Sequence, residues 1–256
     1  MLLAIDMGNT QTALGLFDQD QLLQSWRMPT DRTFTKDEIL VRLLGYFQMS
    51  GLALSCVDTI CFAGVVPQLT REWRAVATQL GVRMIQVGPD TQMVTKVDAP
   101  SPAEVGADRI ANAVAAEALY GAPAIVVDFG TATNVDVVDP RGYYIGGAIA
   151  PGIRISMDAL TARAAKLSSI SLEAPQRTIG RNTVEAVRSG TVAGAAAMAE
   201  GLVARIKDEL GEPGAHVIAT GGRVAGLVAA CTNVFDVIDQ QLTLKGICEI
   251  CRRLQA

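Results

Sequence analysis

The pattern of apolar and polar residues over the first third of the chain predicts three consecutive strands followed by alternating helices and strands. Strands are expected where apolar positions alternate or run together, near residues 2–6, 11–17, 21–28, 58–63 and 83–87. Helices are expected where apolar residues recur every three or four positions, at about 36–49 and 68–80. This order is typical of an α/β lobe that opens with a β-meander.

The same order of elements starts again in the second half of the chain. The proline-bearing segment PDTQMVTKVDAPSPAE is expected to be a loop, and VGADRIANAVAAEALYG is expected to be a helix that Gly121 ends. Three further strands are then expected near 124–128, 133–139 and 142–149. The remaining elements are expected to be helices near 151–165 and 183–210, a strand at 215–219, a helix after TGG, a short strand near 234–236 and a C-terminal helix.

This order amounts to an internal repeat. Asp6 and Asp128 lie 122 positions apart, and each follows an apolar strand, precedes a turn containing glycine and threonine, and leads into two further strands. Two similar α/β lobes, formed by residues 1–115 and 116–256 with a cleft between them, are therefore the predicted architecture.

Composition narrows the class of protein. Half of the 256 residues are hydrophobic, which is enough to bury a sizeable core. The formal charge of -4 comes without a run of like charge, so nucleic acid is not expected as a partner. The first residues lack the features of a signal peptide, and no apolar run approaches the roughly 18 residues that span a bilayer. We therefore expect a cytoplasmic protein that does not bind membranes.

Cysteine and histidine offer little catalytic chemistry in this sequence. The five cysteines are expected to be reduced thiols. Cys248 and Cys251 form a CxxC pair, which suggests either redox or metal chemistry or simply two thiols on one helix face; the lack of a second CxxC favours the latter. The single histidine, His216, opens an apolar strand and is expected to be structural or at the surface.

Each of the two aspartates that begin the repeats ends a buried strand, where an unpaired carboxylate is costly. Asp6 and Asp128 could simply cap their turns, as aspartate often does before glycine. Their equivalent places favour a second interpretation, in which Gly8 and Gly130 let the backbone approach phosphate groups and a Mg²⁺ ion bridges acid and phosphate. Side chains suited to phosphate oxygens follow at Asn9, Thr10, Thr131 and Thr133.

The chain lacks both common nucleotide-binding fingerprints. Neither GxxxxGK followed by Ser or Thr nor a GxGxxG after a strand occurs. The duplicated Asp-Gly hairpins instead resemble those of the actin, sugar-kinase and Hsp70 superfamily, in which two hairpins hold ATP between lobes of ribonuclease H-like topology, with mixed sheets flanked by helices. The stretch IATGGR, residues 218–223, is similar to the motif that borders adenosine in that superfamily.

A more specific resemblance runs from end to end of the chain. Four stretches, in order and with natural spacing, are similar to type III pantothenate kinases: DMGNTQTALGLF, GADRIANAV, DFGTATNVDVVD with YIGGAIAPGI shortly after it, and IGRNTVEAVRSG. The GADR and GAIAPG segments are the most restrictive of these. The resemblance implies ATP-dependent phosphorylation of pantothenate to 4'-phosphopantothenate, the first step of coenzyme A biosynthesis.

The resemblance also implies where ATP and cations bind. The residues implied to contact the nucleotide are Asp6, Met7, Gly8, Asn9, Thr10, Gln11, Thr12, Ala13, Gly130, Thr131, Gly221 and Gly222. Asp6 would hold Mg²⁺ through the phosphates. Asp128 would bind a monovalent cation, either potassium or ammonium.

The GADR segment is implied to bind pantothenate through Gly106, Ala107, Asp108 and Arg109, with Thr183 as a further contact. Asp108 would accept the proton of the primary hydroxyl. The residue chemistry supports this, because a helix start favours an anionic substrate and arginine offers a planar fork for a carboxylate. The alternative is that Asp108 caps the helix, while Arg109 pairs at the surface with a nearby acid, Glu104 or Glu117.

Two departures from the family pattern leave other functions open. The loop before GADR lacks the tyrosine that touches pantothenate in this family, and Asn134 replaces a common threonine. A nucleotide-binding accessory or regulatory protein of the same fold, such as the accessory transcription factors also described in this family, is one alternative. A kinase or phosphatase acting on another small molecule is the other.

The segment GTVAGAAAMAEGLVARI is rich in small residues, which permit close packing of helices. It could be an interior helix of one lobe or part of a subunit interface. The family resemblance favours a homodimer.

Overall fold

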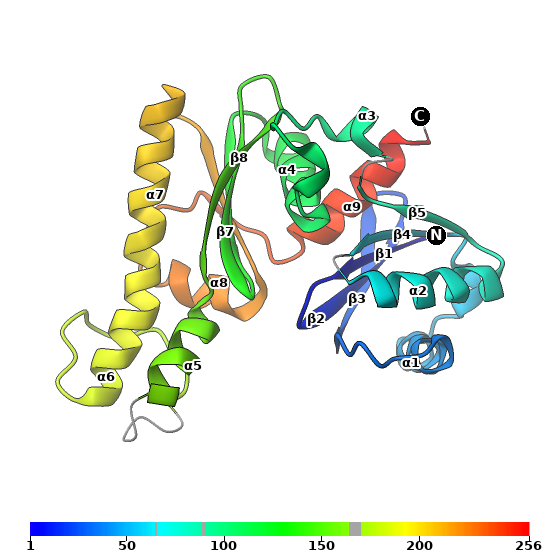
Figure 1. Cartoon of the computed structure of the whole chain (residues 1–256), viewed down its shortest axis with the longest axis horizontal. Helices are drawn as coiled ribbons and strands as arrows, with labels where there is room; N and C mark the ends of the chain where they lie inside the picture. The colour runs from blue at the N-terminus through cyan, green and yellow to red at the C-terminus, as the bar shows by residue number, and fades with distance from the viewer. Residues whose placement is uncertain (65, 89–90, 164–169, 256) are drawn as a thin grey trace. The chain divides into compact units, whose positions relative to one another are not determined.

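The computed structural model describes residues 1–64, 66–88, 91–163 and 170–255. Two compact units divide the chain, one formed by Met1–Ala115 and Leu242–Ala256 and the other by Ala116–Gln241. Each unit contains a five-stranded mixed sheet with helices packed against it (Figure 1). The prediction of an α/β fold with two similar lobes is confirmed.

The first unit is built on a sheet with the strand order β3-β2-β1-β4-β5. Its strands are β1 (Leu2–Met7), β2 (Gln11–Asp18), β3 (Gln21–Pro29), β4 (Thr59–Gly64) and β5 (Arg83–Gln86). The first three strands form the antiparallel meander, while β4 runs parallel to β1 and β5 runs parallel to β4. The carboxyl ends of β1, β4 and β5 therefore lie at one edge of the sheet.

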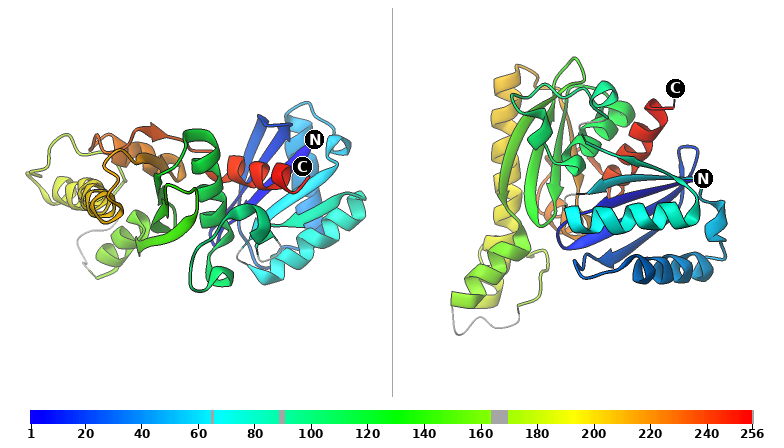
Figure 2. Two further views of the ribbon diagram at one scale, coloured as in Figure 1. Left: turned by 90° about the horizontal axis from the view of Figure 1, so that it is seen from above. Right: turned by 45° about the vertical axis from the view of Figure 1, so that its right-hand side comes forward.

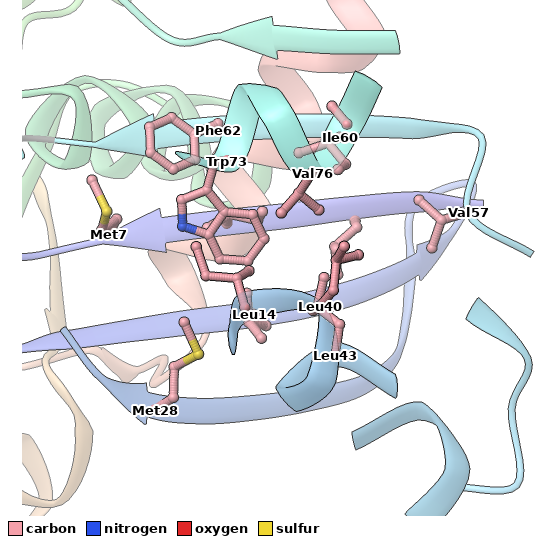
Figure 3. Close-up of a cluster of buried hydrophobic side chains, with 14 of the residues drawn as sticks. Met7, Leu14, Met28, Leu40, Leu43, Val57, Ile60, Phe62, Trp73 and Val76 are labelled. Atoms are coloured by element: carbon pink, nitrogen blue, oxygen red, sulfur yellow. The ribbon is translucent and has the colours of Figure 1, made fainter. Parts of the chain in front are cut away.

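One face of this sheet is covered by α1 (Lys36–Met49) and α2 (Pro67–Leu80). Helix α1 begins with a capping box between Thr35 and Glu38, and α2 ends at Gly81 in the left-handed conformation that glycine adopts without strain. The fully buried ring of Trp73 lies 6.3 Å, centroid to centroid, from that of Phe62 on β4 (Figure 3). The apolar side chains of β1 that the sequence pattern identified thus fill the core with those of the two helices.

The opposite face is covered by α4 (Ala107–Tyr120) and by α9 (Leu242–Arg253). This C-terminal helix was expected in the second lobe, whereas the structure places it in the first unit. Its apolar face carries Leu244, Ile247 and Cys251 into the core of that unit. Gly246 allows α9 to approach α4 closely, because a Cβ on Gly246 would overlap the carbonyl of Ala111 on α4.

The second unit repeats the topology of the first. Its strands are β6 (Ala124–Phe129), β7 (Ala132–Val138), β8 (Tyr144–Pro151), β9 (His216–Thr220) and β10 (Val237–Ile238). They are ordered β8-β7-β6-β9-β10, with β6–β8 as the antiparallel meander and β9 parallel to both β6 and β10. The internal repeat inferred from Asp6 and Asp128 is therefore a repeat of the whole sheet.

One face of the second sheet packs against α5 (Ile153–Arg163), α7 (Gly194–Leu210) and α8 (Gly222–Ala229). Figure 2 shows α7 and α8 on the same side of this sheet. The end of the helix expected over 151–165 lies outside the described residues. A single helix was expected over 183–210, but the structure contains α6 (Thr183–Arg188), a π-helical turn over Ser189–Ala193, and then α7.

Side-chain hydrogen bonds accompany this π-helical turn. The Ser189 hydroxyl donates to the carbonyl of Thr178, and the Thr191 hydroxyl donates to that of Val187. Hydroxyls that bond to backbone carbonyls within a helix often bend it. Gly190 lies within the turn and Gly194 follows it, and both weaken the helical preference further.

Two smaller differences concern segments expected to be a loop and a strand. The expected loop before GADR contains a short helix, α3 (Gln92–Thr95), and a 3₁₀ turn over Pro102–Glu104. The strand expected near 234–236 begins at Val237 instead. None of the helices in the described part of the chain has the length and apolar character needed to cross a membrane.

Candidate active site

The first hairpin joins β1 to β2 at the edge where the parallel strands end. The Gly8 N–H donates to the Gln11 carbonyl at 3.0 Å, which closes a tight turn with Asn9 and Thr10 exposed at its tip. Met7 and Thr12 are each only 1% exposed, so a nucleotide at this turn could meet Met7 only through its backbone. The exposed part of the predicted ATP segment is therefore its tip.

Asp6 is half-buried beside the hairpin and has small neighbours. In register it lies opposite Ala13 on β2 and Ala63 on β4. Alternation along β1 puts Asp6 on the same face as Ala4, which packs in the core formed with α4 and α9. The cross-strand neighbours of the carboxylate are therefore small and apolar.

The start of α4 lies on that same face and at that same edge. Ala107 is buried in one cluster with Ala63 and Val87, which mark the ends of β4 and β5. The hairpin of Asp6 and the GADR segment are thus brought together within the first unit, although more than 90 positions separate them in sequence.

In GADR the Asp108 side chain lies against Gly106. A Cβ on Gly106 would lie 2.5 Å from Oδ1 of Asp108, so the Asp108 carboxylate occupies the space beside the helix start. Asp108 and Arg109 are both half-buried in the first turn of α4. A carboxylate and a guanidinium beside backbone N–H groups can orient a hydroxylated, anionic molecule.

The second hairpin, between β6 and β7, occupies the equivalent place in its sheet and has a turn that is one residue shorter. The Gly130 N–H donates to the Ala132 carbonyl at 3.0 Å, and Gly130 and Thr131 are exposed. Gly152, directly after β8, packs against this turn so closely that a Cβ would overlap the Thr131 carbonyl. Thr133 differs from expectation: it is buried, and its hydroxyl has no hydrogen-bond partner among the described residues.

Asp128 has polar neighbours where Asp6 has alanines. It lies opposite Asn134 on β7 and Thr220 on β9, and cross-strand partners in register share a face of the sheet. A carboxylate, an amide and a hydroxyl supply oxygen atoms of the kind that bind hard cations. The donor set around Asp128 therefore fits a cation such as potassium, and that around Asp6 fits Mg²⁺ shared with phosphate.

The predicted adenosine motif adjoins the second hairpin. Gly221 has φ +108°, and a Cβ on it would lie 2.5 Å from the N and O atoms of Phe129, the residue after Asp128. Gly222 follows with φ +63° and begins α8. Within the second unit, the backbone of this turn and that of the hairpin are therefore in contact.

Thr183 lies in a different part of the second unit. It is exposed at the start of α6, which Asn182 caps by accepting from the Glu185 N–H at 2.9 Å. Thr183 lines a groove of about 620 Å³ formed with residues of α5 and α7, including Leu160 and Met198. Pro151, next to Gly152, lines the same groove.

The CxxC pair is buried with a third cysteine. Cys248 and Cys251 of α9 and Cys61 of β4 belong to one core cluster, and all five cysteines are free thiols. A hydrogen bond with Cys251, together with burial, raises the pKa of Cys61, and burial raises the pKa of Cys248 to about 12. Protonated, shielded thiols are poor nucleophiles.

His216 is exposed at the start of β9, as expected.

Three residues near the hairpins were not predicted from the sequence to belong to the site: Thr30, Gly152 and Thr220. Thr30 and Gly152 each follow a proline that ends the third strand of a meander, and each contacts the adjoining hairpin. The proline that precedes both residues was the sequence signal that could have identified them. Thr220 could be found only from the register of β9 against β6.

Solved structures share this fold. The chain aligns with a ROK hexokinase from Thermus thermophilus at a TM-score of 0.54 and 13% identity, over 99% of both chains. It aligns with a 2-hydroxyisocaproyl-CoA dehydratase activator from Clostridium difficile, determined with ADPNP, at 0.55 and 13%, over 97% and 92% of the two chains. A protein from Campylobacter jejuni, named as a putative Baf family transcriptional activator, aligns at a TM-score of 0.62 and 18% identity. The alignment covers 99% of this chain and 98% of that one. The fold is that of the actin-like ATPases and sugar kinases.

Sequence comparison identifies the family within this class. A profile of the family described as type III pantothenate kinase matches residues 2–205. The type III pantothenate kinase of Moorella thermoacetica is 46% identical over 250 residues, which cover 96% of this chain and 97% of that one. That of Thermomicrobium roseum is 48% identical over 248 residues, covering 96% and 95%. This protein belongs to the type III pantothenate kinase family.

Proposed function

We propose that this protein transfers the γ-phosphoryl group of ATP to the primary hydroxyl of pantothenate, giving 4'-phosphopantothenate in the first step of coenzyme A biosynthesis. Full-length similarity to pantothenate kinases gives the reaction. The observation that carries the proposal is that Asp6 and the GADR segment lie on one face, at one edge, of the first sheet. This placement puts a phosphate-binding turn beside a turn suited to an anionic alcohol.

In this proposal the first hairpin binds the phosphates of ATP. Gly8, Asn9 and Thr10 supply exposed backbone N–H groups and side chains, and Asp6 holds Mg²⁺ through the phosphate oxygens. Gly130 and Thr131 of the second hairpin contact the nucleotide as well. Gly221 and Gly222 border the adenosine, where the absence of side chains lets the backbone approach closely.

Asp108 acts as the general base, and Arg109 pairs with the anionic substrate. The Asp108 carboxylate orients the primary hydroxyl of pantothenate and accepts its proton as the oxygen attacks the γ-phosphorus. Gly106 and Ala107 place the helix N-terminus against the substrate, and Thr183 provides a further contact. A bound Mg²⁺ would neutralise charge that develops on the phosphoryl oxygens.

A monovalent cation, potassium or ammonium, is proposed to bind at Asp128. The carboxylate lies in register with Asn134 and Thr220, which add an amide oxygen and a hydroxyl. Phosphoryl transfer depends chiefly on positioning and charge neutralisation, so a second cation near the phosphates would assist it.

We also propose that the protein is a homodimer that works in the cytoplasm. Ala195, Ala196 and Ala199 of α7 pack inside the second unit, so the helix is partly interior. Gly194, Ala195 and Met198 of the same helix line the 620 Å³ groove, and Leu160 of that lining is 47% exposed. Such a surface suits a second subunit. Sedimentation at micromolar concentration should give about twice the 27.0 kDa chain mass, whereas an active 27.0 kDa species would contradict the dimer.

Product analysis tests the proposed reaction directly. Purified protein is incubated with ATP, Mg²⁺, K⁺ and pantothenate, and the products are identified by mass. We expect 4'-phosphopantothenate and ADP. Nucleotide binding without turnover would favour the regulatory alternative, and turnover only with another hydroxylated compound would favour a kinase of different specificity.

A further inference from the structure

We propose that Thr30 is a positioning residue that fixes the tip of the first hairpin, and that Thr12 acts through it rather than on the phosphates. This inference rests on the proposed function for its kinetic consequence, but its structural basis is independent. The Thr12–Thr30 pair lies wholly within the first unit.

Two hydrogen bonds tie Thr30 to the hairpin. Its N–H donates to the carbonyl of Thr10 at 2.9 Å, and its hydroxyl lies 2.8 Å from the hydroxyl of Thr12. One bond therefore reaches the exposed tip and the other reaches β2, two residues further along. Thr12 is 1% exposed, so water competes little for this side-chain hydrogen bond.

The loop that carries Thr30 is itself well anchored. Met28 before it and Phe34 after it are buried in the first core, at 5% and 7% exposure. Asp31 accepts from the Thr33 N–H at 2.9 Å and from its hydroxyl at 2.7 Å. The Arg42 guanidinium lies 4.3 Å from the centre of the Phe34 ring. Thr30 can therefore hold the hairpin against a fixed point.

Burial decides how Thr12 contributes. Its hydroxyl is shielded from solvent and already shared with Thr30, whereas Thr10 is exposed at the tip. A phosphate that binds at the tip would meet Thr10 and the backbone N–H groups. Thr12 would set where those groups point, because it fixes the residue that bonds to the Thr10 carbonyl.

The second unit supports this interpretation. Pro29 lies opposite Gln11 at the start of β2, and Pro151 lies opposite Ala132 at the start of β7. The next residues, Thr30 and Gly152, both contact their hairpins. The repeated structure thus supports each hairpin from the same place, by a hydroxyl pair in one unit and by close backbone packing in the other.

The test replaces the hydroxyl at constant volume. Thr30→Val should raise the KM for ATP and weaken binding of an ATP analogue about 3- to 10-fold, the value of one hydrogen bond. The KM for pantothenate should stay within about twofold, the scatter expected of a neutral change. Thr30→Ser should restore ATP affinity. Thr78→Val is the matched control, because it removes a hydroxyl bonded to the Arg74 carbonyl on the surface of α2.

Thr12→Val provides a second route if Thr30→Val does not fold, and the double variant should bind the analogue no more weakly than the weaker single variant. Thr30→Val with wild-type ATP affinity, or with equal losses for ATP and pantothenate, would overturn the inference. Analogue binding by calorimetry separates this from the proposed reaction: if the wild type bound nucleotide but left pantothenate unchanged, only the proposed function would fail.

Discussion

The two hairpins of this protein occupy equivalent places in their sheets and differ by one residue in turn length and in the residues around them. Each closes with a glycine N–H bonded at 3.0 Å to the following strand, and each follows a half-buried aspartate at the end of the first strand of its sheet. Asp6 lies between Ala13 and Ala63, whereas Asp128 lies between Asn134 and Thr220. A duplicated scaffold thus offers one carboxylate between two alanines and one between side chains that carry oxygen atoms, so we expect the two sites to bind different cations.

The largest effect is expected at a third carboxylate that belongs to neither hairpin. Asp108→Asn keeps the size of the side chain but cannot accept the substrate proton, so kcat should fall about 10²- to 10⁴-fold. A loose transition state would place the loss at the lower end. The KM for ATP should be nearly unchanged, unlike in Asp6→Asn.

Steady-state kinetics of both substrates measure this, with Glu104→Gln as a control that removes an exposed negative charge from the preceding turn. If Asp108→Asn retained more than about a third of kcat, far above the range for a lost general base, Asp108 would not be the general base.

The next effect concerns how the hairpins are supported. Gly152→Ala places a Cβ on the Thr131 carbonyl, so the second hairpin must move. Displacement of an active-site group by about 1 Å can cost about 10²-fold, and we expect a loss of kcat/KM of that order. Gly214→Ala is the control, since a Cβ there meets nothing within 4 Å. Equal activity of the two variants would show that the contact of Gly152 does not support the site.

A smaller effect should appear when the surroundings of Asp128 are made like those of Asp6. The double variant Asn134→Ala, Thr220→Val removes both neighbouring side-chain oxygen atoms that could bind the cation and leaves the carboxylate of Asp128. The K⁺ concentration for half-maximal activity should rise about 3- to 10-fold, equivalent to about one hydrogen bond. The Mg²⁺ requirement serves as the internal control and should not change. An unaltered K⁺ requirement would mean that Asp128 binds the cation without these neighbours.

Local sequence signals predicted most of the fold. Period-two and helical patterns located the strands and helices, because these patterns depend on residues that are close in sequence. The Asp-Gly turns at equivalent places revealed the duplication. The family resemblance was needed to propose that GADR binds the substrate. Its placement near Asp6 depends on the burial of Ala107 in one core cluster with Ala63, and these two segments are distant in sequence.

What the sequence did not predict depends on tertiary contacts. The C-terminal helix joins the first unit because its apolar face fits a sheet at the other end of the chain. The helix over 183–210 contains a π-helical turn where the Ser189 hydroxyl bonds to the Thr178 carbonyl, which the fold brings near. The burial of Thr12 and Thr133 follows from which face of β2 or β7 they occupy next to the hairpins.

One measurement tests most directly the claim that equivalent hairpins hold different cations for one phosphoryl transfer. The rate of 4'-phosphopantothenate formation is measured over a grid of Mg²⁺ and K⁺ concentrations for the wild type, Asp6→Asn and Asp128→Asn. We predict that Asp6→Asn raises the Mg²⁺ requirement and the KM for ATP, while Asp128→Asn raises the K⁺ requirement alone, each by about tenfold or more, as for a lost charged interaction. Wild-type activity that is equal with and without K⁺ or ammonium, or variants that both shift the same cation, would contradict the account.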